Sequence, residues 1–231
     1  NSPVTHTARR LRSADMAYRI VSTVTEAATS GDLIALSAVK AELDIDGAAK
    51  DDLLKQYVSA ASAAISQHCN RTFALEGLRD EIWPLRGPHA YQLPTLLPSL
   101  QLSRWPVATA PPVSVEENGV ALEEGTGFRI EPKSGLVYRL DGTGYPMAWS
   151  AWPIVVAYKA GFEQIPPDVA DAALRMVTAR FRAKGRDPFV RQDRIPDVRD
   201  VSYWIATGAD AGNMTPDVVD LLENYRVPVM A

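Results

Sequence analysis

Cysteine and histidine, the side chains that most often bind metals or act as nucleophiles and bases, are rare in this chain. Its 231 residues contain one cysteine, Cys69, and three histidines, His6, His68 and His89. Their spacing fits no zinc site or cysteine–histidine pair, and there is no glycine-rich phosphate loop, Gly-x-Ser-x-Gly turn or His-Glu-x-x-His helix. The sequence therefore predicts a protein that is not an enzyme and that holds no metal and no cofactor.

His68 and Cys69 come at the end of an apolar stripe in the segment 51–69, so we interpret both as packing residues. The acidic pairs Asp51/Asp52, Glu116/Glu117 and Glu123/Glu124 are each adjacent in sequence. Neighbouring side chains point in different directions and do not converge on one site. We interpret these acids as capping or surface charges.

Basic residues are concentrated between Arg175 and Arg199, where eight Arg and Lys face three Asp. This run has three interpretations: a solvated surface, a contact with DNA phosphates, or a grip on a neighbouring subunit. No aromatic platform or recognition helix accompanies it, which disfavours nucleic-acid recognition. The candidates for inter-subunit or DNA-facing charge are Arg186, Arg191, Arg194 and Arg199.

Helical periodicity is found at both ends of the chain. Apolar residues recur at three- and four-residue steps, with capping residues at the ends of the runs, and predict helices at about 37–45, 51–69, 167–184 and 216–226. The second and third are the longest, about five turns each. We expect these two to pack on each other.

Between the helical ends, residues from about 78 to 158 predict a β region. Short segments rich in Val, Ile, Leu, Tyr and Trp alternate there with Pro, Gly and the pair Asn118-Gly119. An Asn-Gly pair accepts the positive φ angles of a tight hairpin turn. The sequence therefore predicts a small antiparallel sheet.

Residues 1–31 differ from the rest of the chain. They are rich in Thr, Ser and Ala, and Arg9, Arg10, Arg12 and Arg19 make them basic. We interpret them as a partly flexible N-terminal arm, which could lie on a neighbouring protein, and residues 32–231 as one domain. No apolar run is long enough for a bilayer and no signal peptide is recognisable, so we expect no membrane contact.

Several stretches, taken in order, resemble the head-tail connector (adaptor) proteins of long-tailed bacteriophages and phage-like gene transfer agents. The resemblance covers residues 32–227; the first 31 residues and the segment 77–105 depart from the family pattern. The stretches that carry it are Leu36-Ser-Ala-Val-Lys-Ala-Glu-Leu-Asp-Ile-Asp46, Asp51-Asp-Leu-Leu54, Asn70-Arg-Thr-Phe73, Trp105-Pro-Val107, Trp152-Pro153, Val155-Val-Ala-Tyr-Lys-Ala-Gly-Phe162, Pro166-Pro167 and Leu221-Leu-Glu-Asn-Tyr-Arg226.

This resemblance implies an α+β fold. It consists of a helical bundle, with two long helices plus short N- and C-terminal helices, and a small antiparallel β domain inserted between the long helices. It also implies a structural virion protein of the head-tail neck, assembled in the bacterial cytoplasm. Its copies would form a closed homo-oligomeric ring, a dodecamer, with double-stranded DNA passing through the bore without sequence-specific binding.

The implied partners are the portal protein on one side and a tail-side stopper or tail terminator protein on the other. In the family the C-terminal helix and tail dock on the portal, which transfers that role here to Val218, Leu221, Leu222, Tyr225 and Arg226. Packing of this helix on its own domain is the alternative. Tyr203 and Trp204 are candidate interface anchors, because aromatic residues are common at interface hot spots.

A second function remains open at this point. The basic run from Arg175 to Arg199 could make the protein a DNA-binding or packaging-associated module. Phosphate binding weakens steeply as salt rises, whereas contacts with an apolar component persist.

Overall fold

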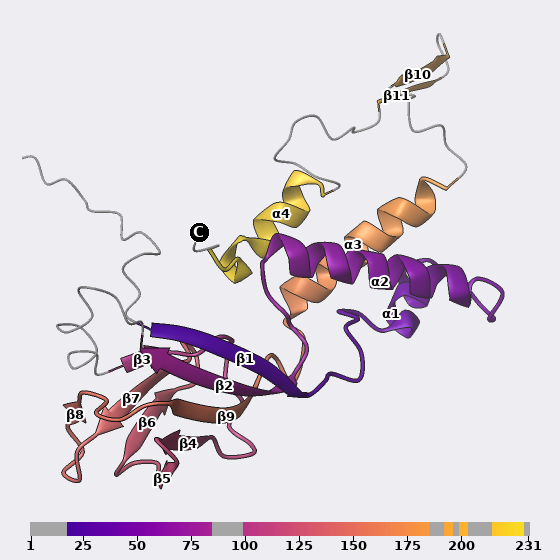
Figure 1. Ribbon diagram of the computed structural model, residues 1–231. Coiled ribbons are helices and arrows are strands. Elements are labelled where there is room, and N and C mark those ends of the chain that lie inside the picture. The colour runs from indigo at the N-terminus through magenta and orange to yellow at the C-terminus, as the bar shows by residue number, and fades with distance from the viewer. Residues whose placement is uncertain (1–17, 85–98, 185–191, 196–198, 203–213, 229–231) are drawn as a thin grey trace, which may run out of the picture. The chain divides into compact units, whose positions relative to one another are not determined.

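The computed structural model describes residues 18–84, 99–184, 192–195, 199–202 and 214–228 (Figure 1). The chain divides into two compact units. The β unit comprises Asn1–Ala28, Leu75–Phe162 and Pro228–Ala231, and the helical unit comprises Thr29–Ala74 and Glu163–Val227. Each unit is therefore built from separated stretches of sequence.

The larger sheet of the β unit has five strands in the order β1-β2-β9-β4-β5, and every neighbouring pair is antiparallel (Figure 1). Its central strand β9 alternates buried and less buried residues, as expected for a sheet with one face on a core. The strands are β1 (Tyr18–Glu26), β2 (Glu76–Pro84), β9 (Ile154–Ala160), β4 (Ser114–Glu117) and β5 (Val120–Leu122).

A second antiparallel sheet has the order β3-β7-β6, with β8 also paired to β7. Its strands are β3 (Ser99–Gln101), β6 (Phe128–Glu131), β7 (Leu136–Leu140) and β8 (Pro146–Met147). The two sheets share one hydrophobic core, in which Ile82 and Val156 of the larger sheet pack with Leu100, Phe128 and Val137 of the smaller one. A layered β structure thus accounts for the burial in this unit.

The hairpin between β4 and β5 turns at Asn118 and Gly119, whose φ angles are 50° and 79°. Two successive positive φ angles match the twist of the flanking strands. The Asn-Gly pair predicted this turn correctly.

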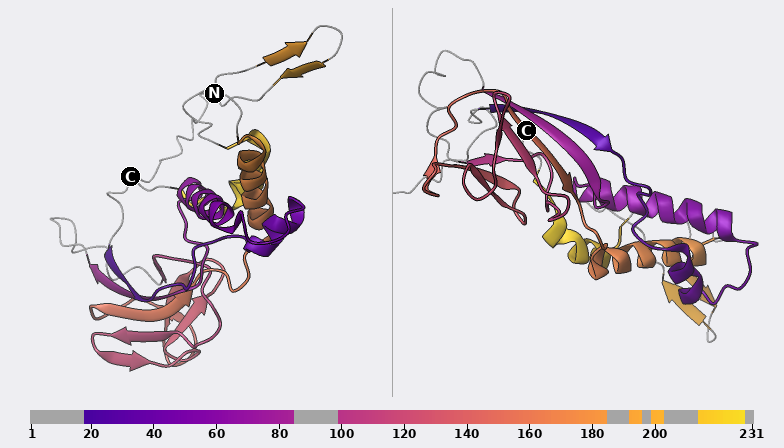
Figure 2. Two further views of the ribbon diagram at one scale, coloured as in Figure 1. Left: turned by 90° about the vertical axis from the view of Figure 1, so that its right-hand side faces the viewer. Right: turned by 90° about the horizontal axis from the view of Figure 1, so that it is seen from below.

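The helical unit contains α1 (Leu36–Glu42), α2 (Asp51–His68), α3 (Pro167–Arg182) and α4 (Pro216–Leu222), which continues into a 3₁₀ turn at Glu223–Tyr225. Helices α2 and α3 lie side by side, and Leu54, Val58 and Val177 are buried between them and α1 (Figure 2, right). Asp51 begins α2 and accepts a hydrogen bond from Lys40 Nζ of α1 at 2.8 Å. None of the described helices combines the length and apolarity needed to cross a bilayer.

Two segments form strands where the sequence indicated none. Tyr18–Glu26, within the segment interpreted as an N-terminal arm, is β1 and pairs along its length with β2. Gln192–Ile195 and Arg199–Ser202, within a segment without clear periodicity, pair with each other as β10 and β11. These strands are recognised from their backbone pairing. Their sequences show no strong alternation of apolar residues that would have indicated a strand.

The predicted fold class, a helical bundle of two long helices with a small inserted β domain, is wrong. The described residues contain four α-helices, two of them only seven residues long, and, besides the β10–β11 pair, two antiparallel sheets of five and four strands. The fold is strand-rich because the two sheets enclose a hydrophobic core of their own, separate from the core formed by α1, α2 and α3. The sequence prediction treated these strands as an insertion, whereas they build a two-layered unit of their own.

Gly77 makes the pairing of β1 with β2 possible. The register shifts between Val24 and Glu26, and this bulge brings β1 close to Gly77. A Cβ atom at Gly77 would lie 2.9 Å from the Cβ of Glu26 and 3.0 Å from Thr25 Oγ1. No side chain fits without a shift of β1.

We therefore expect Gly77→Ala to lower the free energy of unfolding by about 1–3 kcal/mol, the usual cost of overpacking. Urea unfolding followed by circular dichroism measures this. Gly142→Ala is the matched control, since nothing lies within 4 Å of its Cβ position. Equal stability of the two variants would contradict the role of Gly77.

Candidate functional site

The residues predicted to dock on the portal lie on α4 and the turn that follows it. Val218 and Leu222 are almost completely buried, at 1% and 0% exposure, and Met214 just before the helix is buried as well. Helix α4 packs on α3 within the helical unit. Its apolar edge is therefore occupied by its own domain.

Arg175 of α3 connects α3 to α4. Its Nη1 donates to Asp217 Oδ2 of α4 at 2.9 Å, and its Nε donates to Asp171 Oδ2, one turn earlier in α3, at 2.9 Å. The hydroxyl of Thr215 and the guanidinium of Arg175 hold the pKa of Asp217 below its usual range. This network is exposed to solvent, so it adds little stability and mainly fixes orientation.

The far end of α4 is attached to the end of α2. The backbone N–H of Val227 donates to the carbonyl of Cys69 at 2.9 Å, and the Cys69 thiol lies 4.0 Å from the carbonyl oxygen of Leu222. The rings of Tyr225 and Phe73 are in tilted contact with centroids 6.0 Å apart. The chain is thus held on both α2 and α3 up to Val227.

The five residues predicted to dock on the portal differ in how deeply they are buried. Val218 and Leu222 are buried, Leu221 and Tyr225 are half-buried, and Arg226 is exposed. Partial burial and the nearby carboxylate of Asp168 raise the pKa of Tyr225 above its usual value. Of the five residues, Leu221, Tyr225 and Arg226 keep solvent-accessible surface.

The other predicted site residues are only partly within the described chain. Tyr203, Trp204, Arg186 and Arg191 lie outside the described residues. Arg194 and Arg199 belong to β10 and β11, where Arg194 pairs with Asp200 and Arg199 with Ile195 in the backbone register. Nothing in the described structure assigns these residues to a common site.

The described part of the basic run makes contacts inside the helical unit. Besides the ion pairs of Arg175, the guanidinium of Arg180 stacks 4.5 Å from the centre of the Tyr57 ring on α2. An open depression between α1 and α3 is lined by Glu42 and Asp171 as well as Arg175 and Arg182. Two acids and two bases give it no preference for an anion.

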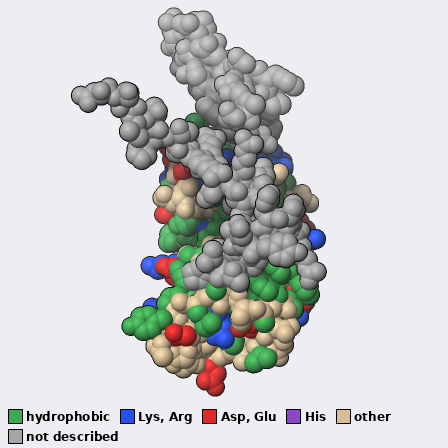
Figure 3. All heavy atoms as spheres, turned by 60° about the vertical axis from the view of Figure 1, so that its left-hand side comes forward, with side chains coloured by type: hydrophobic (Ala, Val, Ile, Leu, Met, Phe, Trp, Pro, Cys, Tyr) green, Lys and Arg blue, Asp and Glu red, His purple; other side chains and the backbone are tan. Residues whose placement is uncertain are grey.

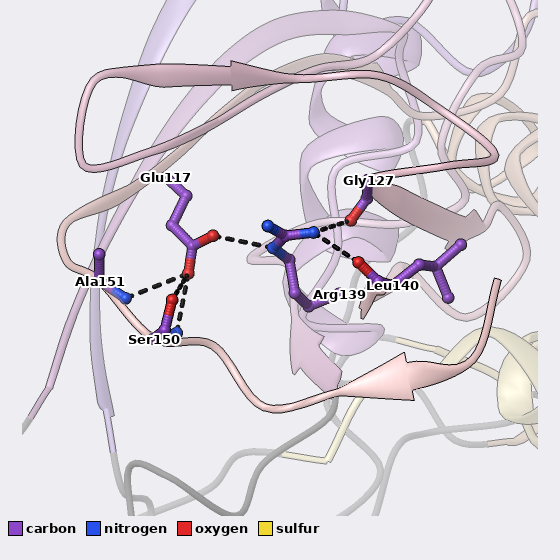
Figure 4. Close-up of polar contacts among 6 residues, drawn as sticks. All are labelled: Glu117, Gly127, Arg139, Leu140, Ser150 and Ala151. Carbon is purple, nitrogen blue, oxygen red and sulfur yellow. Dashed lines mark hydrogen bonds and ion pairs between the residues drawn. The ribbon is translucent and has the colours of Figure 1, made fainter. Parts of the chain in front are cut away.

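The β unit contains a buried ionic cluster that the sequence did not indicate (Figure 4). The interpretation of Glu117 as a surface charge is wrong, because only 6% of this residue is exposed. Its carboxylate accepts hydrogen bonds from Arg139 Nε at 2.8 Å and from the backbone N–H groups of Ser150 at 2.8 Å and Ala151 at 3.1 Å. Arg139 also donates to the carbonyl of Gly127 (Figure 4).

The cluster holds the charge of Glu117 in place. Burial alone raises the pKa of a carboxyl group, but the hydrogen bonds from Arg139, Ser150 and Ala151 outweigh burial and bring the pKa of Glu117 below its usual value. The only sequence signal was the position of Glu117 at the end of a β-strand before a tight turn. Alternation placed it on the inner face with Val115, but no local pattern identified Arg139 as its partner.

Exposed hydrophobic side chains are found mainly on the β unit. In the space-filling view they lie among acidic and basic side chains and form no single broad patch (Figure 3). Trp83 and Val21 are 44% exposed. The full set of large exposed hydrophobic residues in the described chain is Val21, Val24, Trp83, Val120, Tyr145 and Met147.

Within the described ranges, no three His, Cys, Asp or Glu side chains are grouped as a metal site. His68 is half-buried, and its Nε2 is buried without a hydrogen-bond partner. Cys69 is fully buried.

The comparisons with known proteins agree with the predicted resemblance. Residues 33–103, which include α1, α2, β2 and β3, match the family model of the phage gp6-like head-tail connector protein. The chain resembles the head-tail connector family. No curated protein sequence matches it significantly.

Two solved structures have a similar fold to this connector-like chain. One is a chain from the neck of an empty gene transfer agent particle computed with C6 symmetry, at 20% identity, with 90% of this chain and 97% of that chain covered and a TM-score of 0.50. The other is from the virion of a native gene transfer agent particle, at 19% identity, with 90% and 96% covered and a TM-score of 0.51. Identities this low show similarity of fold.

For Glu117→Gln we expect a loss of roughly 3 kcal/mol in unfolding free energy at pH 7, because an amide cannot accept from all the donors and leaves the buried Arg139 without a counter-charge. The folded-state pKa of Glu117 is depressed. Its contribution is therefore present above the unfolded pKa of about 4.3 and lost as pH falls through the folded value. Urea unfolding from pH 3 to 7 measures this.

The control for this experiment is Glu116→Gln on the opposite face of β4, for which we expect a change within about 0.5 kcal/mol. The difference between the two variants should shrink as the pH falls. If Glu117→Gln is as stable as Glu116→Gln at pH 7, the cluster does not stabilise the fold.

Burial raises the pKa of the Cys69 thiol to about 11, although Arg71 and Arg226 favour the thiolate. Only the thiolate reacts rapidly with disulfide reagents. We therefore expect no labelling by Ellman's reagent at pH 8 in the native protein and one thiol per chain in urea.

An Ala157→Cys variant, with its new thiol exposed on β9, is the positive control for labelling. Leu222→Ala should accelerate labelling of Cys69, because it loosens α4 where it covers the thiol. Rapid labelling of the unmodified native chain would show that α4 does not protect Cys69.

Proposed function

We propose that this protein is a structural component of the head-tail neck of a phage or phage-like particle and performs no reaction. The match of residues 33–103 to a head-tail connector family carries this proposal. Similarity of fold to chains from a gene transfer agent neck and virion supports it. The protein accordingly resides in the virion, after assembly in the bacterial cytoplasm.

In this function the copies form a closed dodecameric ring and double-stranded DNA passes through its bore. A ring of identical copies needs two different complementary surfaces on each copy, repeated by rotation. DNA then meets the ring without sequence-specific binding.

One side of the ring faces the portal protein, and the other a tail-side stopper or tail terminator protein. The portal contact falls on the flank formed by half-buried Leu221 and Tyr225 and exposed Arg226, and on the chain beyond it. Val218 and Leu222 contribute by holding α4 on its own domain, because both are already buried there. Docking by this flank leaves α4 in place.

The DNA-binding alternative is weaker. Of the basic residues between Arg175 and Lys184, Arg175 is in ion pairs and Arg180 is stacked on Tyr57. These contacts reduce the positive charge available for phosphates. DNA retardation that falls steeply with salt, in a protein that does not load on the portal, would favour this alternative.

The docking proposal predicts the behaviour of Leu221→Ser/Arg226→Glu. We expect this double variant to load on the cognate portal about tenfold more weakly, because it removes apolar contact area and reverses a charge on the docking flank. Native mass spectrometry or light scattering of mixtures with the portal measures loading.

The matched control is Lys55→Glu, a charge reversal on an exposed position of α2. Protection of Cys69 from labelling verifies that α4 stays attached in each variant. Unchanged loading of the double variant with α4 attached would remove the flank from the portal contact.

A further inference from the structure

Strand β1 is an edge strand with an unusually receptive outer side. It has nine residues, whereas β5 at the other edge of the sheet has three. Five of its residues, Ile20, Val21, Thr23, Val24 and Thr25, are β-branched, and it contains neither Pro nor Lys, the residues that usually protect an edge. From Val21 to Glu26 every residue is exposed.

The paired side of β1 is firmly held. The Tyr18 hydroxyl accepts a hydrogen bond from the N–H of Gln101 at 2.9 Å, and Ser22 Oγ lies 3.0 Å from Ser103 Oγ. At the other end, Glu26 pairs with Lys159 of β9 at 2.7 Å. No strand of the described residues pairs with the outer side of β1. Because β1 is fixed at its start, middle and end, this side is a preorganised template for another strand.

The β10–β11 hairpin, in contrast, lacks a third strand among the described residues. It is a two-stranded sheet on its own, and a lone hairpin of four-residue strands is marginal in water. A third strand would supply the hydrogen bonds that this hairpin lacks.

We propose that the β10–β11 hairpin of one copy adds to the free edge of β1 in the next copy. This inference rests on the proposed function, because a ring requires each copy to carry a donor and a different acceptor. The two surfaces are unlike, so the contact propagates from copy to copy and does not close a two-fold dimer. The occupant of the β1 edge is therefore a second copy of this chain.

The chain lengths on either side of the hairpin are compatible with this exchange. Residues 183–191 connect α3 to β10, and residues 203–215 connect β11 to α4. At about 3.3 Å per residue, the shorter connection spans at most roughly 30 Å. That reach exceeds the width of several strands, about 4.8 Å each.

Cysteine cross-linking tests the contact directly. Thr23→Cys places a thiol on exposed β1, and Ser202→Cys places one on β11. Equimolar single variants are mixed, assembled and treated with a short bis-maleimide; buried Cys69 can stay in place. We expect covalent dimers at least about tenfold above the background of each variant alone, and a ladder of multimers when both cysteines are in one chain.

The control replaces Thr23→Cys by Ala157→Cys, which is exposed on the same sheet but in the central strand β9. It should give no dimers with Ser202→Cys. A second variant replaces residues 192–202 by a Gly-Ser linker. We expect it to keep its thermal unfolding transition and to lose the ring mass.

Several results would overturn the contact. One is a cross-linked dimer of Thr23→Cys alone, which indicates that β1 pairs with β1 of another copy. Another is a cross-link that forms only within a single chain. Rings that form without cross-links, or without the hairpin, also overturn it but leave the proposed function intact. Cross-linked dimers that never form rings or load on a portal would instead keep the contact and refute the neck function.

Discussion

The buried ion pair between Glu117 and Arg139 is the interaction on which the β unit depends. Glu117 ends β4 in the larger sheet, Arg139 lies on β7 in the smaller one, and the backbone of Ser150 and Ala151 leads into β9. One carboxylate therefore joins three segments. Because an unpaired charge in this position would be costly, the two sheets are held in a single arrangement.

A second buried carboxylate organises the other side of the same unit. Asp80 of β2 is fully buried and accepts hydrogen bonds from the Tyr158 hydroxyl at 2.7 Å and from Ser103. Burial and the nearby Asp80 carboxylate raise the pKa of Tyr158 above its usual value, so its hydroxyl remains a donor. Ser103 in turn contacts Ser22 of β1. Polar groups thus fix β1, which is an edge strand among the described residues.

In the helical unit, the C-terminal segment is held in a fixed position on α2 and α3. Hydrophobic burial of Val218 and Leu222 provides the attachment, and the ion pair of Arg175 with Asp217 sets its direction. The hydrogen bond from Val227 to Cys69 carries this order to the last described residues. A segment held in this way would lose little conformational entropy if Arg226 bound a partner, as the proposed docking requires.

The sequence by itself determined the features that arise from neighbouring residues. The periodicity of Leu54, Val58 and Ile65 indicated α2, and Asn118-Gly119 indicated a tight turn, because both are local effects. Motif order also identified the connector resemblance. Only the tertiary structure decided that Glu117 is buried against Arg139, that Leu222 is covered by its own domain, and that β1 pairs with β2 some sixty residues away. These contacts join distant stretches of the chain, and their stability comes from burial and pairing that no local pattern records.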